Sequence, residues 1–265
     1  MPDLSIMPHN RYLIPLMLSL WLLVNFSVVA TTSPLRLATL EYPPFIYEEN
    51  HQAKGLIVEI VQEAFRRMNQ PVEIEFYPVA RGLMMINNGD IDGYFTLKKT
   101  PERASKLLFT TQPLIQQTFV WFTRADSRVS YQGNLTAMAP FKIGVVGTAS
   151  YGAQFDAAVA GGTLSNIETS RDFIGNLKKL IAGRVELIVN SYDVGMEIIR
   201  QLHHEAQIKT LEPPIEVVNS YLAFTRKKEL QQQADDFDAV MRLMMADGTI
   251  DRLKHRYPAN ISIGY

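Results

Sequence analysis

Three basic residues are the strongest candidates for binding chemistry in this 265-residue chain. Arg103 ends the segment Thr100-Pro101-Glu102-Arg103, just past a predicted strand, and Lys98 precedes it by five positions. A guanidinium group matches a carboxylate through two parallel hydrogen bonds, so a site built on Arg103 would take a carboxylate. Arg81 is a third candidate. The alternatives are a surface arginine on a turn for Arg103 and a solvated helix position for Arg81.

Two further features could complete a binding site. Tyr42 and Phe45 could form an aromatic wall, since a ring offers apolar area at low entropic cost and its face attracts cations. Ordinary core packing is the alternative. The turn Gly147-Thr148-Ala149-Ser150 lies between a predicted strand and a predicted helix, where free backbone N–H groups bind anions. Ser150 or Thr148 could equally cap that helix, and a cap would leave other N–H groups available.

The sequence contains no recognisable catalytic or metal-binding pattern. It has no Gly-x-Ser-x-Gly motif, phosphate-binding loop or His-Glu-x-x-His motif. Glu41 is the one obvious carboxylate for acid–base chemistry in a cleft. The five histidines show no metal-ligand spacing: His9, His51, His203, His204 and His255. We therefore expect no enzyme activity, no catalytic residues, no metal site and no cofactor.

Composition excludes several classes of protein. Apolar residues make up 47% of the chain and charged residues 20%, which is typical of a globular protein. The formal net charge of −1 provides no general basic field for a nucleic acid. The absence of cysteine excludes disulfides, thiolate metal sites and a cysteine-linked lipid anchor.

The first thirty residues resemble a targeting segment. Arg11 precedes a long apolar run, Tyr12 to Ala30, which ends in Val28-Val29-Ala30. A basic residue, an apolar stretch and small residues at a cleavage point are typical of a secretory signal peptide. We expect residues 1–30 to be removed near Ala30 and the mature protein to reach the periplasm. An uncleaved membrane anchor is the alternative, because the run approaches the roughly 20 residues that span a bilayer.

The rest of the chain alternates predicted strands and helices, and these elements must position the candidate residues. Gly55 to Met68 has apolar residues at helical spacing, whereas residues 72–76 alternate as in a strand. Alternating strands and helices predict an α/β fold with mostly parallel sheets. The predicted strands are residues 35–40, 72–76, 91–95, 119–123, 142–146, 185–189 and 217–224. The predicted helices are residues 55–68, 80–88, 172–182, 193–201, 229–245 and 249–256.

The order of several short segments resembles family 3 of the bacterial extracellular solute-binding proteins. In this sequence the segments are Tyr42 to Phe45, Gly55 to Met68, Asn88 to Gly93, Thr100 to Arg103, Gly147 to Ser150, and Asp247 to Thr249. No single segment is specific, but their order and spacing together are. The resemblance runs from about Leu35 to Tyr257.

The resemblance implies the type II periplasmic binding protein fold, in which two α/β lobes flank a cleft. Each lobe would contain a mostly parallel sheet flanked by helices. Lobe 1 would comprise residues 31–118 and 222–265, and lobe 2 would comprise residues 119–221. Two crossover strands, near residues 117–123 and 220–225, would form the hinge. The ligand would lie between the lobes at the carboxyl ends of strands.

The resemblance also implies roles for single residues. Arg103 would bind the ligand carboxylate, and Arg81 resembles the arginine of a Pro-x-x-Arg segment that faces the cleft in a divergent branch of the family. Lys98 stands where polar amino-acid receptors carry a small hydroxyl residue. Ser191 stands where they carry an aspartate that pairs with the ligand ammonium. Asp193 or Glu41 could replace that acid, or the ligand could be an anion.

These observations predict a periplasmic solute-binding protein that captures a small, polar, carboxylate-bearing, amino-acid-like molecule. Its protein partner would be the permease of an ABC-type transporter, and no nucleic acid would be involved. Two alternatives remain at the level of sequence. One is a periplasmic ligand sensor that acts without a transporter. The other is a dehydratase of small carboxylic acids on the same fold, for which Glu41 would be the acid or base.

Overall fold

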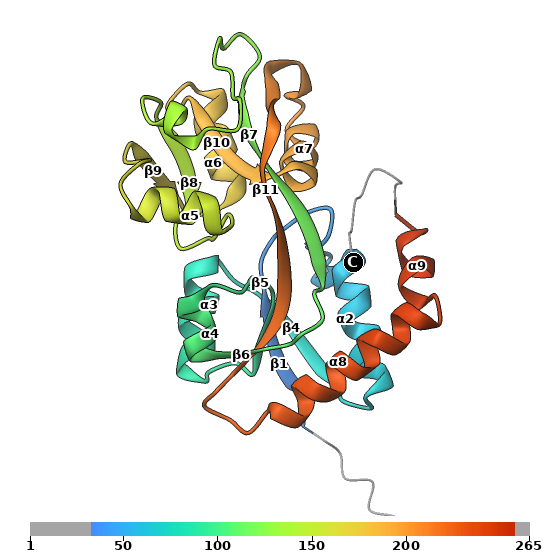
Figure 1. Cartoon of the computed structure of the whole chain (residues 1–265). Helices are drawn as coiled ribbons and strands as arrows, with labels where there is room; N and C mark the ends of the chain where they lie inside the picture. Colours follow the sequence, from blue (N-terminus) through green and yellow to red (C-terminus); the bar gives the residue numbers. More distant parts are fainter. Residues whose placement is uncertain (1–32, 258–265) are drawn as a thin grey trace, which may run out of the picture. The chain divides into compact units, whose positions relative to one another are not determined.

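The computed structural model describes residues 33–257, and the predicted signal peptide lies outside them. In the lower lobe of Figure 1, β1 (Leu35–Thr39) lies between β4 (Val72–Phe76) and β5 (Gly93–Lys98) and is parallel to both. Strand β6 (Leu107–Phe109) adds an antiparallel edge by pairing with β11. The carboxyl ends of β1 and β5 point toward the other lobe (Figure 1). Glu41 lies just after the end of β1, and Lys98 is the last residue of β5.

Helices cover both faces of this sheet (Figure 1). One side carries α2 (Leu56–Arg67), α8 (Gln231–Ala246) and α9 (Thr249–Lys254), and the other carries α3 (Val79–Asn88) and α4 (Pro101–Lys106). The apolar stripe predicted for α2 is buried, and its Phe65 ring lies 5.4 Å from that of Phe237 on α8. Burial of such a side chain contributes roughly 1.5–3 kcal/mol.

The upper lobe contains a second parallel arrangement. Strand β8 (Ile143–Val146) pairs in parallel with β9 (Ile167–Ser170) and with β10 (Leu187–Ser191). Three helices pack around these strands: α5 (Ala153–Ala160), α6 (Phe173–Ile181) and α7 (Tyr192–Gln201). Two short 3-10 helices complete the lobe, η2 (Leu135–Met138) and η3 (Glu205–Gln207).

Two long antiparallel strands join the lobes: β7 (Ile115–Arg124) and β11 (Ile208–Thr225) (Figure 1). Their register shifts between Leu211 and Glu216, so β7 pairs with residues 216–220 near the lower lobe and 208–211 in the upper lobe. Strand β10 pairs antiparallel to the second half of β7. One continuous sheet therefore runs through both lobes, and its central strands are antiparallel while its outer strands are parallel.

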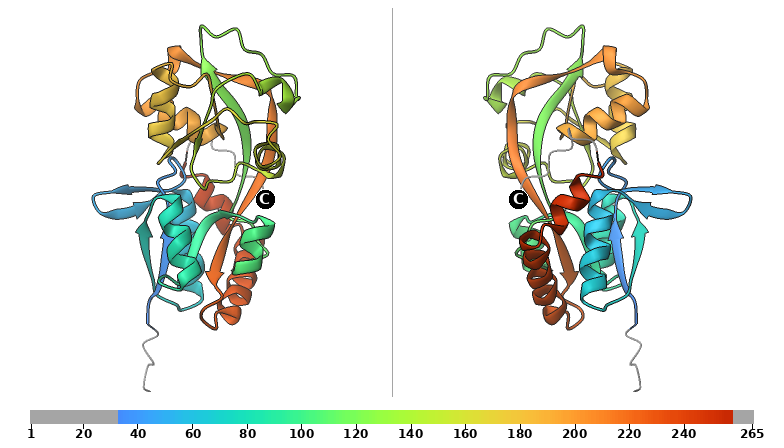
Figure 2. Two further views of the ribbon diagram at one scale, coloured as in Figure 1. Left: turned by 90° about the vertical axis from the view of Figure 1, so that its left-hand side faces the viewer. Right: turned by 90° about the vertical axis from the view of Figure 1, so that its right-hand side faces the viewer.

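The structure corrects several expectations about single elements. The segment around Thr100 to Arg103, for which no helix was predicted, is the start of helix α4, because the Thr100 hydroxyl accepts a hydrogen bond from the Arg103 N–H and Pro101 occupies the first helical turn. Strand β11 begins nine residues earlier than expected, and β5 is shifted toward Lys98. Strand β9 and the hairpin of β2 (Tyr47–Glu49) and β3 (Gln52–Lys54), which projects to one side in Figure 2, were not expected.

The predicted alternation of strands and helices is otherwise confirmed. Gly89 ends α3 in the left-handed conformation at φ 84°, as expected for a glycine at a helix C-terminus. Within residues 33–257, no helix has the length and apolar character needed to cross a membrane.

Candidate functional site

A narrow cavity of about 30 Å³ lies between the lobes at the carboxyl end of β5. It brings together Tyr42, Lys98 and Arg103 from the first part of the chain with Ser150 from the turn after β8. Thr96, Tyr94, Phe119 and Tyr151 also line it. Four of the predicted site residues therefore share one cavity.

Arg103 lies at the contact between the lobes. Its Nη1 donates to the Lys98 carbonyl at 3.0 Å, and its Nη2 donates to the Thr148 carbonyl at 2.9 Å. These two bonds hold the guanidinium across the cleft, between α4 and the turn after β8. Burial lowers the pKa of Arg103, although an arginine stays charged at neutral pH.

Lys98 is a half-buried cation beside Arg103. Its Nζ lies 4.6 Å from the centroid of the Phe119 ring. Among the described residues, this ammonium has no hydrogen-bond or ion-pair partner, although Asp156 attracts it at longer range. Burial and the neighbouring charge of Arg103 lower the pKa of Lys98 to about 7. An anion entering this cavity would therefore meet two cationic groups.

The acidic side chains nearby have other partners. Asp156, on the first turn of α5, accepts hydrogen bonds from the Ser150 hydroxyl and, at 2.9 Å, from the Tyr151 N–H. Glu41 accepts from the Glu48 N–H at 3.0 Å, and burial raises its pKa. Neither carboxylate forms a hydrogen bond with Lys98 or Arg103.

Two threonines beside the cavity have left-handed backbone conformations. Thr96 has φ 65° and Thr148 has φ 63°. Such values are unfavourable for β-branched residues, at a cost of order 1–3 kcal/mol each. Thr96 lies where the register of β5 against β11 shifts between Tyr221 and Ala223, which is a β-bulge. Thr148 is exposed, and its carbonyl accepts the bond from Arg103.

Tyr42 and Ser191 are linked by a residue that the sequence did not single out. Gln117, on β7, donates through Nε2 to the Tyr42 hydroxyl and to the Ser191 hydroxyl, both at 3.0 Å. Its Oε1 is buried and has no hydrogen-bond partner in the part of the chain that the structure describes. Gln117 alternates with the apolar residues Ile115 and Phe119 along the predicted crossover, and this polar residue on an apolar face was the one sequence signal available.

Phe45 and Arg81 lie outside both interlobe cavities. Phe45 is fully buried in the core, and its ring centroid lies 6.5 Å from that of Tyr42. Arg81 is exposed on α3, with its guanidinium 5.1 Å from the centroid of the Tyr77 ring. Phe45 therefore supports the position of Tyr42, and Arg81 stacks at the surface.

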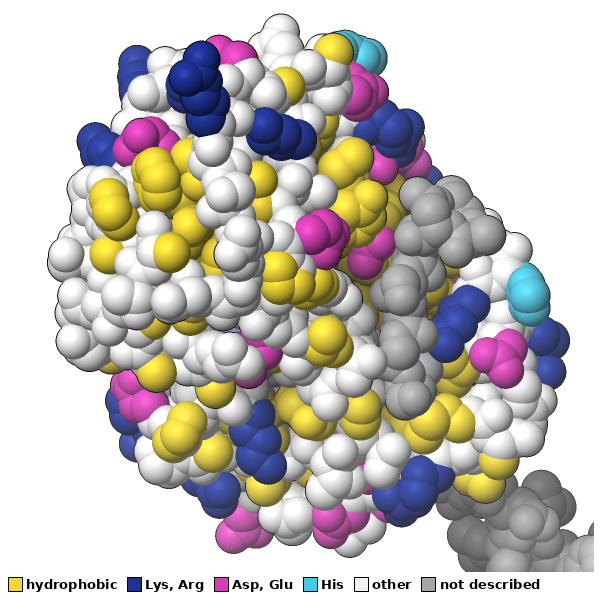
Figure 3. All heavy atoms as spheres, turned by 45° about the horizontal axis from the view of Figure 1, so that its top comes forward, with side chains coloured by type: hydrophobic (Ala, Val, Ile, Leu, Met, Phe, Trp, Pro, Cys, Tyr) yellow, Lys and Arg dark blue, Asp and Glu magenta, His cyan; other side chains and the backbone are white. Residues whose placement is uncertain are grey.

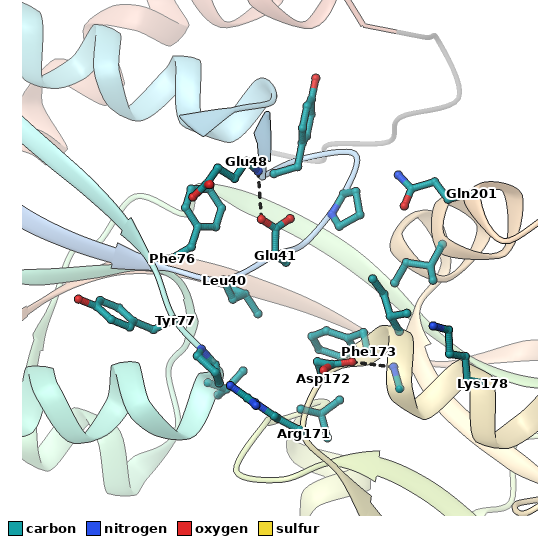
Figure 4. Close-up of a pocket in the computed structure, with 18 residues that line it drawn as sticks. Leu40, Glu41, Glu48, Phe76, Tyr77, Arg171, Asp172, Phe173, Lys178 and Gln201 are labelled. Atoms are coloured by element: carbon teal, nitrogen blue, oxygen red, sulfur yellow. Dashed lines mark hydrogen bonds between the residues drawn. The ribbon is translucent and has the colours of Figure 1, made fainter. Parts of the chain in front are cut away.

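A second, wider cavity of about 670 Å³ adjoins the narrow one (Figure 4). Glu41 and Glu48 line it from lobe 1, and Arg171 and Lys178 line it from lobe 2. In Figure 4, Asp172 turns back to accept the Gly175 N–H, which caps α6. No group of His, Asp or Glu side chains among residues 33–257 has an arrangement that could hold a metal ion.

Residues 35–260 match the family model of the bacterial extracellular solute-binding proteins, family 3. The chain belongs to this family. The resemblance predicted from the sequence is thus confirmed, and the family is one of extracellular solute-binding proteins. A search of curated protein sequences found no significant match.

Similar solved structures confirm the two-lobed fold. A histidine kinase sensor domain described as similar to periplasmic binding proteins shares 16% identity over 86% of this chain and 97% of its own, with a TM-score of 0.76. An ancestral arginine-binding protein bound to arginine shares 18% sequence identity over 84% of this chain and 97% of its own, with a TM-score of 0.73. A structure from work on glutathione import in Streptococcus mutans shares 15% sequence identity over 88% of this chain and 98% of its own, with a TM-score of 0.75.

Proposed function

We propose that this protein captures a small, carboxylate-bearing solute between its lobes and presents it to an ABC-type transporter. The observation that carries the proposal is the pair of cations in the narrow cavity, Lys98 and Arg103, with no acidic side chain hydrogen-bonded to either among the described residues. A carboxylate would supply the missing negative charge and could accept bonds from the guanidinium. The solute is amino-acid-like or a simple organic acid.

The lobe boundaries are part of the proposal. Lobe 1 is residues 31–118 and 222–265, lobe 2 is residues 119–221, and β7 and β11 act as the hinge between them. The bond from Arg103 to the Thr148 carbonyl, which crosses between the lobes, supports a role for this arginine in closure. Opening would break that bond and admit the solute, and Thr148 and Ser150 would then face it from lobe 2.

The position of the usual ammonium-binding acid favours an acidic ligand over a zwitterion. Ser191 occupies that position, and its hydroxyl is engaged by Gln117. Asp193 follows in the first turn of α7, as one candidate replacement, and Glu41 in the wider cavity is the other. A ligand with a carboxylate and no ammonium group needs neither of them.

Export belongs to the same proposal. Residues 1–30 act as a signal peptide that is cleaved near Ala30, and the mature protein works in the periplasm. Membership of an extracellular family supports this location. The segment itself lies outside the described residues.

The experiment that tests the proposed function is substitution of Arg103. A thermal-shift screen of the mature protein against amino acids, dicarboxylates, aromatic acids and sugars first identifies a binder, since a ligand at 100 times its Kd adds roughly 2.7 kcal/mol. Calorimetry then compares wild type, Arg103→Ala, Arg103→Lys and the surface control Arg242→Ala. Loss of one partner of a desolvated charge pair costs on the order of 2–5 kcal/mol, or roughly 30- to several-thousand-fold in affinity.

Arg103→Lys should fail almost as badly as Arg103→Ala, because an ammonium lacks the planar fork. Circular dichroism should show all variants folded. If Arg103→Ala binds within about threefold of wild type, less than ~0.7 kcal/mol, the carboxylate role of Arg103 is wrong.

A second candidate function is favoured by one finding, the fold match to a histidine kinase sensor domain. In that case the closed form would contact a signalling protein instead of a permease. Uptake of the labelled ligand by cells that lack this protein separates the two functions. Loss of uptake supports the transporter, and unchanged uptake with a lost transcriptional response supports the sensor.

A further inference from the structure

The wide cavity is continuous with the proposed anion site. Leu40, Val79 and Phe173 line both cavities, so these three side chains form the boundary between them. Leu40 and Val79 come from lobe 1, and Phe173 begins α6 in lobe 2. A molecule held at Arg103 could therefore extend past Phe173 into the wide cavity.

The two cavities differ strongly in size. The narrow one, at about 30 Å³, exceeds the roughly 10–15 Å³ that one water molecule needs and has room only for a small group such as a carboxylate. The wide one, at about 670 Å³, is as large as many small-molecule sites, which occupy roughly 300–1,000 Å³. A free amino acid or a short acid held at Arg103 would leave most of this space to water.

The walls of the wide cavity are mainly apolar and aromatic. Phe76, Tyr77 and Pro43 contribute from lobe 1, and Phe173, Ile174 and Ile198 contribute from lobe 2. Aromatic walls on both lobes favour a flat ring between them, because rings attract one another in offset or edge-to-face contacts. Ile174 is 38% exposed although it is apolar, and an apolar ligand group would cover it.

The charged residues of this cavity carry both signs. Glu41 and Glu48 lie on one side, with Arg171 and Lys178 opposite (Figure 4). A third acid in the lining, Asp172, accepts the Gly175 N–H and caps α6. With three acidic and two basic groups, the cavity has no cationic lining that would favour an anionic body over a neutral one. Elsewhere on the surface, apolar side chains lie scattered among charged ones, as Figure 3 shows for one face. The wide cavity is distinguished by its concave shape and by its aromatic walls.

We propose that the natural solute is an amphipathic acid whose apolar, ring-bearing body occupies the wide cavity. This inference rests on the proposed function for its head group, which Arg103 and Lys98 would bind in the narrow cavity. The body passes the boundary of Leu40, Val79 and Phe173 and contacts both lobes. It therefore stabilises the closed form through contacts that a short acid cannot make.

Calorimetry with four probes on the mature protein tests this inference. Hydrocinnamate and indolepropionate carry a ring and a carboxylate, propionate carries only the carboxylate, and hydrocinnamyl alcohol carries only the ring. Burial of a phenyl ring predicts that hydrocinnamate binds about 30- to 100-fold more tightly than propionate.

Two substitutions serve as a matched pair. Ile174→Gln places a polar group in the cavity wall and should weaken hydrocinnamate at least about fivefold while leaving propionate unchanged. Met196→Gln changes a side chain of equal exposure, 37% against 38%, that does not line the cavity. It should change neither affinity.

The outcomes separate the two proposals. Propionate within threefold of hydrocinnamate, or no binding of either aromatic acid at millimolar concentration, overturns the inference. Equal effects of Ile174→Gln and Met196→Gln also overturn it. Hydrocinnamyl alcohol that binds as tightly as hydrocinnamate, with sensitivity to Ile174→Gln, supports the ring compartment and refutes the carboxylate anchor of the proposed function.

Discussion

Lys98→Met should stabilise the ligand-free protein. Methionine keeps an unbranched, largely apolar side chain of similar length and removes the ammonium group. That ammonium lies over the Phe119 ring beside Arg103 and forms no ion pair among residues 33–257, although Asp156 attracts it at longer range. A largely desolvated charge without an ion-pair partner opposes folding, and its removal relieves that cost.

The magnitude follows from the lowered pKa. A change from the ordinary 10.5 to about 7 sets an upper bound of ~5 kcal/mol, at ~1.36 kcal/mol per pKa unit. The Lys98 side chain is only half-buried at the cleft, so solvent screening reduces this figure, and we expect ~2 kcal/mol. For a protein of this length, that gain raises Tm by about 4–8 °C.

The pH dependence gives the prediction its sign. Below pH 7 the lysine is charged in both the folded and the unfolded protein, so wild type carries the full cost. As the pH rises from about 7 toward 10.5, only the unfolded protein keeps the proton, and wild type gains stability relative to Lys98→Met. The advantage of the variant should therefore be largest at pH 6 and smaller at pH 9.

Thermal unfolding at these two pH values, without ligand, measures the difference. Lys99→Met is the matched control, because Lys99 is the exposed neighbour and its ammonium lies 5.9 Å from the Phe109 ring centroid. It should change stability by less than ~0.5 kcal/mol. If Lys98→Met is no more stable than wild type at pH 6, or if its advantage does not shrink by pH 9, the buried-charge reasoning is refuted.

Two other predictions concern export and the fold. Mass spectrometry of the native protein should find the mature chain beginning at Thr31 in the soluble periplasmic fraction, and a full-length membrane-bound product would contradict export. Asp238→Asn should destabilise the protein by about 1.5–3 kcal/mol, because the buried Asp238 carboxylate accepts bonds from the Thr111 N–H, the Thr111 hydroxyl and the Gln112 N–H. Asp236→Asn, at an exposed position on the same helix, should be nearly neutral in chemical denaturation and serves as the control.

Local patterns were sufficient for much of the fold. The strict alternation of residues 72–76 and the apolar spacing of residues 55–68 each report on one buried face, and β4 and α2 form there. Hydrophobic periodicity does not reveal a short strand that pairs with only one other strand, because such a strand buries too few side chains to form a pattern. Strand β9 therefore escaped prediction, because its four residues are only partly buried and pair with β8 alone.

The candidate site was less accessible to prediction from sequence. The segment Thr100 to Arg103 was recognisable through its resemblance to the family, although the helix that it starts was not predicted. Its contact with the Thr148 carbonyl joins residues 45 positions apart, and no local pattern specifies it. The position of Gln117 between Tyr42 and Ser191 likewise depends on the antiparallel crossover of β7, which brings three distant segments together.

Several unfavourable features of the described structure lie around the narrow cavity. Thr96 and Thr148 have left-handed backbone conformations, Lys98 is a half-buried cation without an ion-pair partner, and Gln117 has a buried oxygen without a donor. Each lowers stability by an amount comparable to a single mutation. Local strain that persists in an otherwise consistent fold is expected at binding sites. A bound carboxylate would offset the cost at Lys98, and the two carbonyl bonds of Arg103 already fix the plane of its guanidinium for that ligand. The folding free energy lost at these residues in the ligand-free protein would thus be recovered when the anion binds. The bound anion would therefore stabilise the closed form.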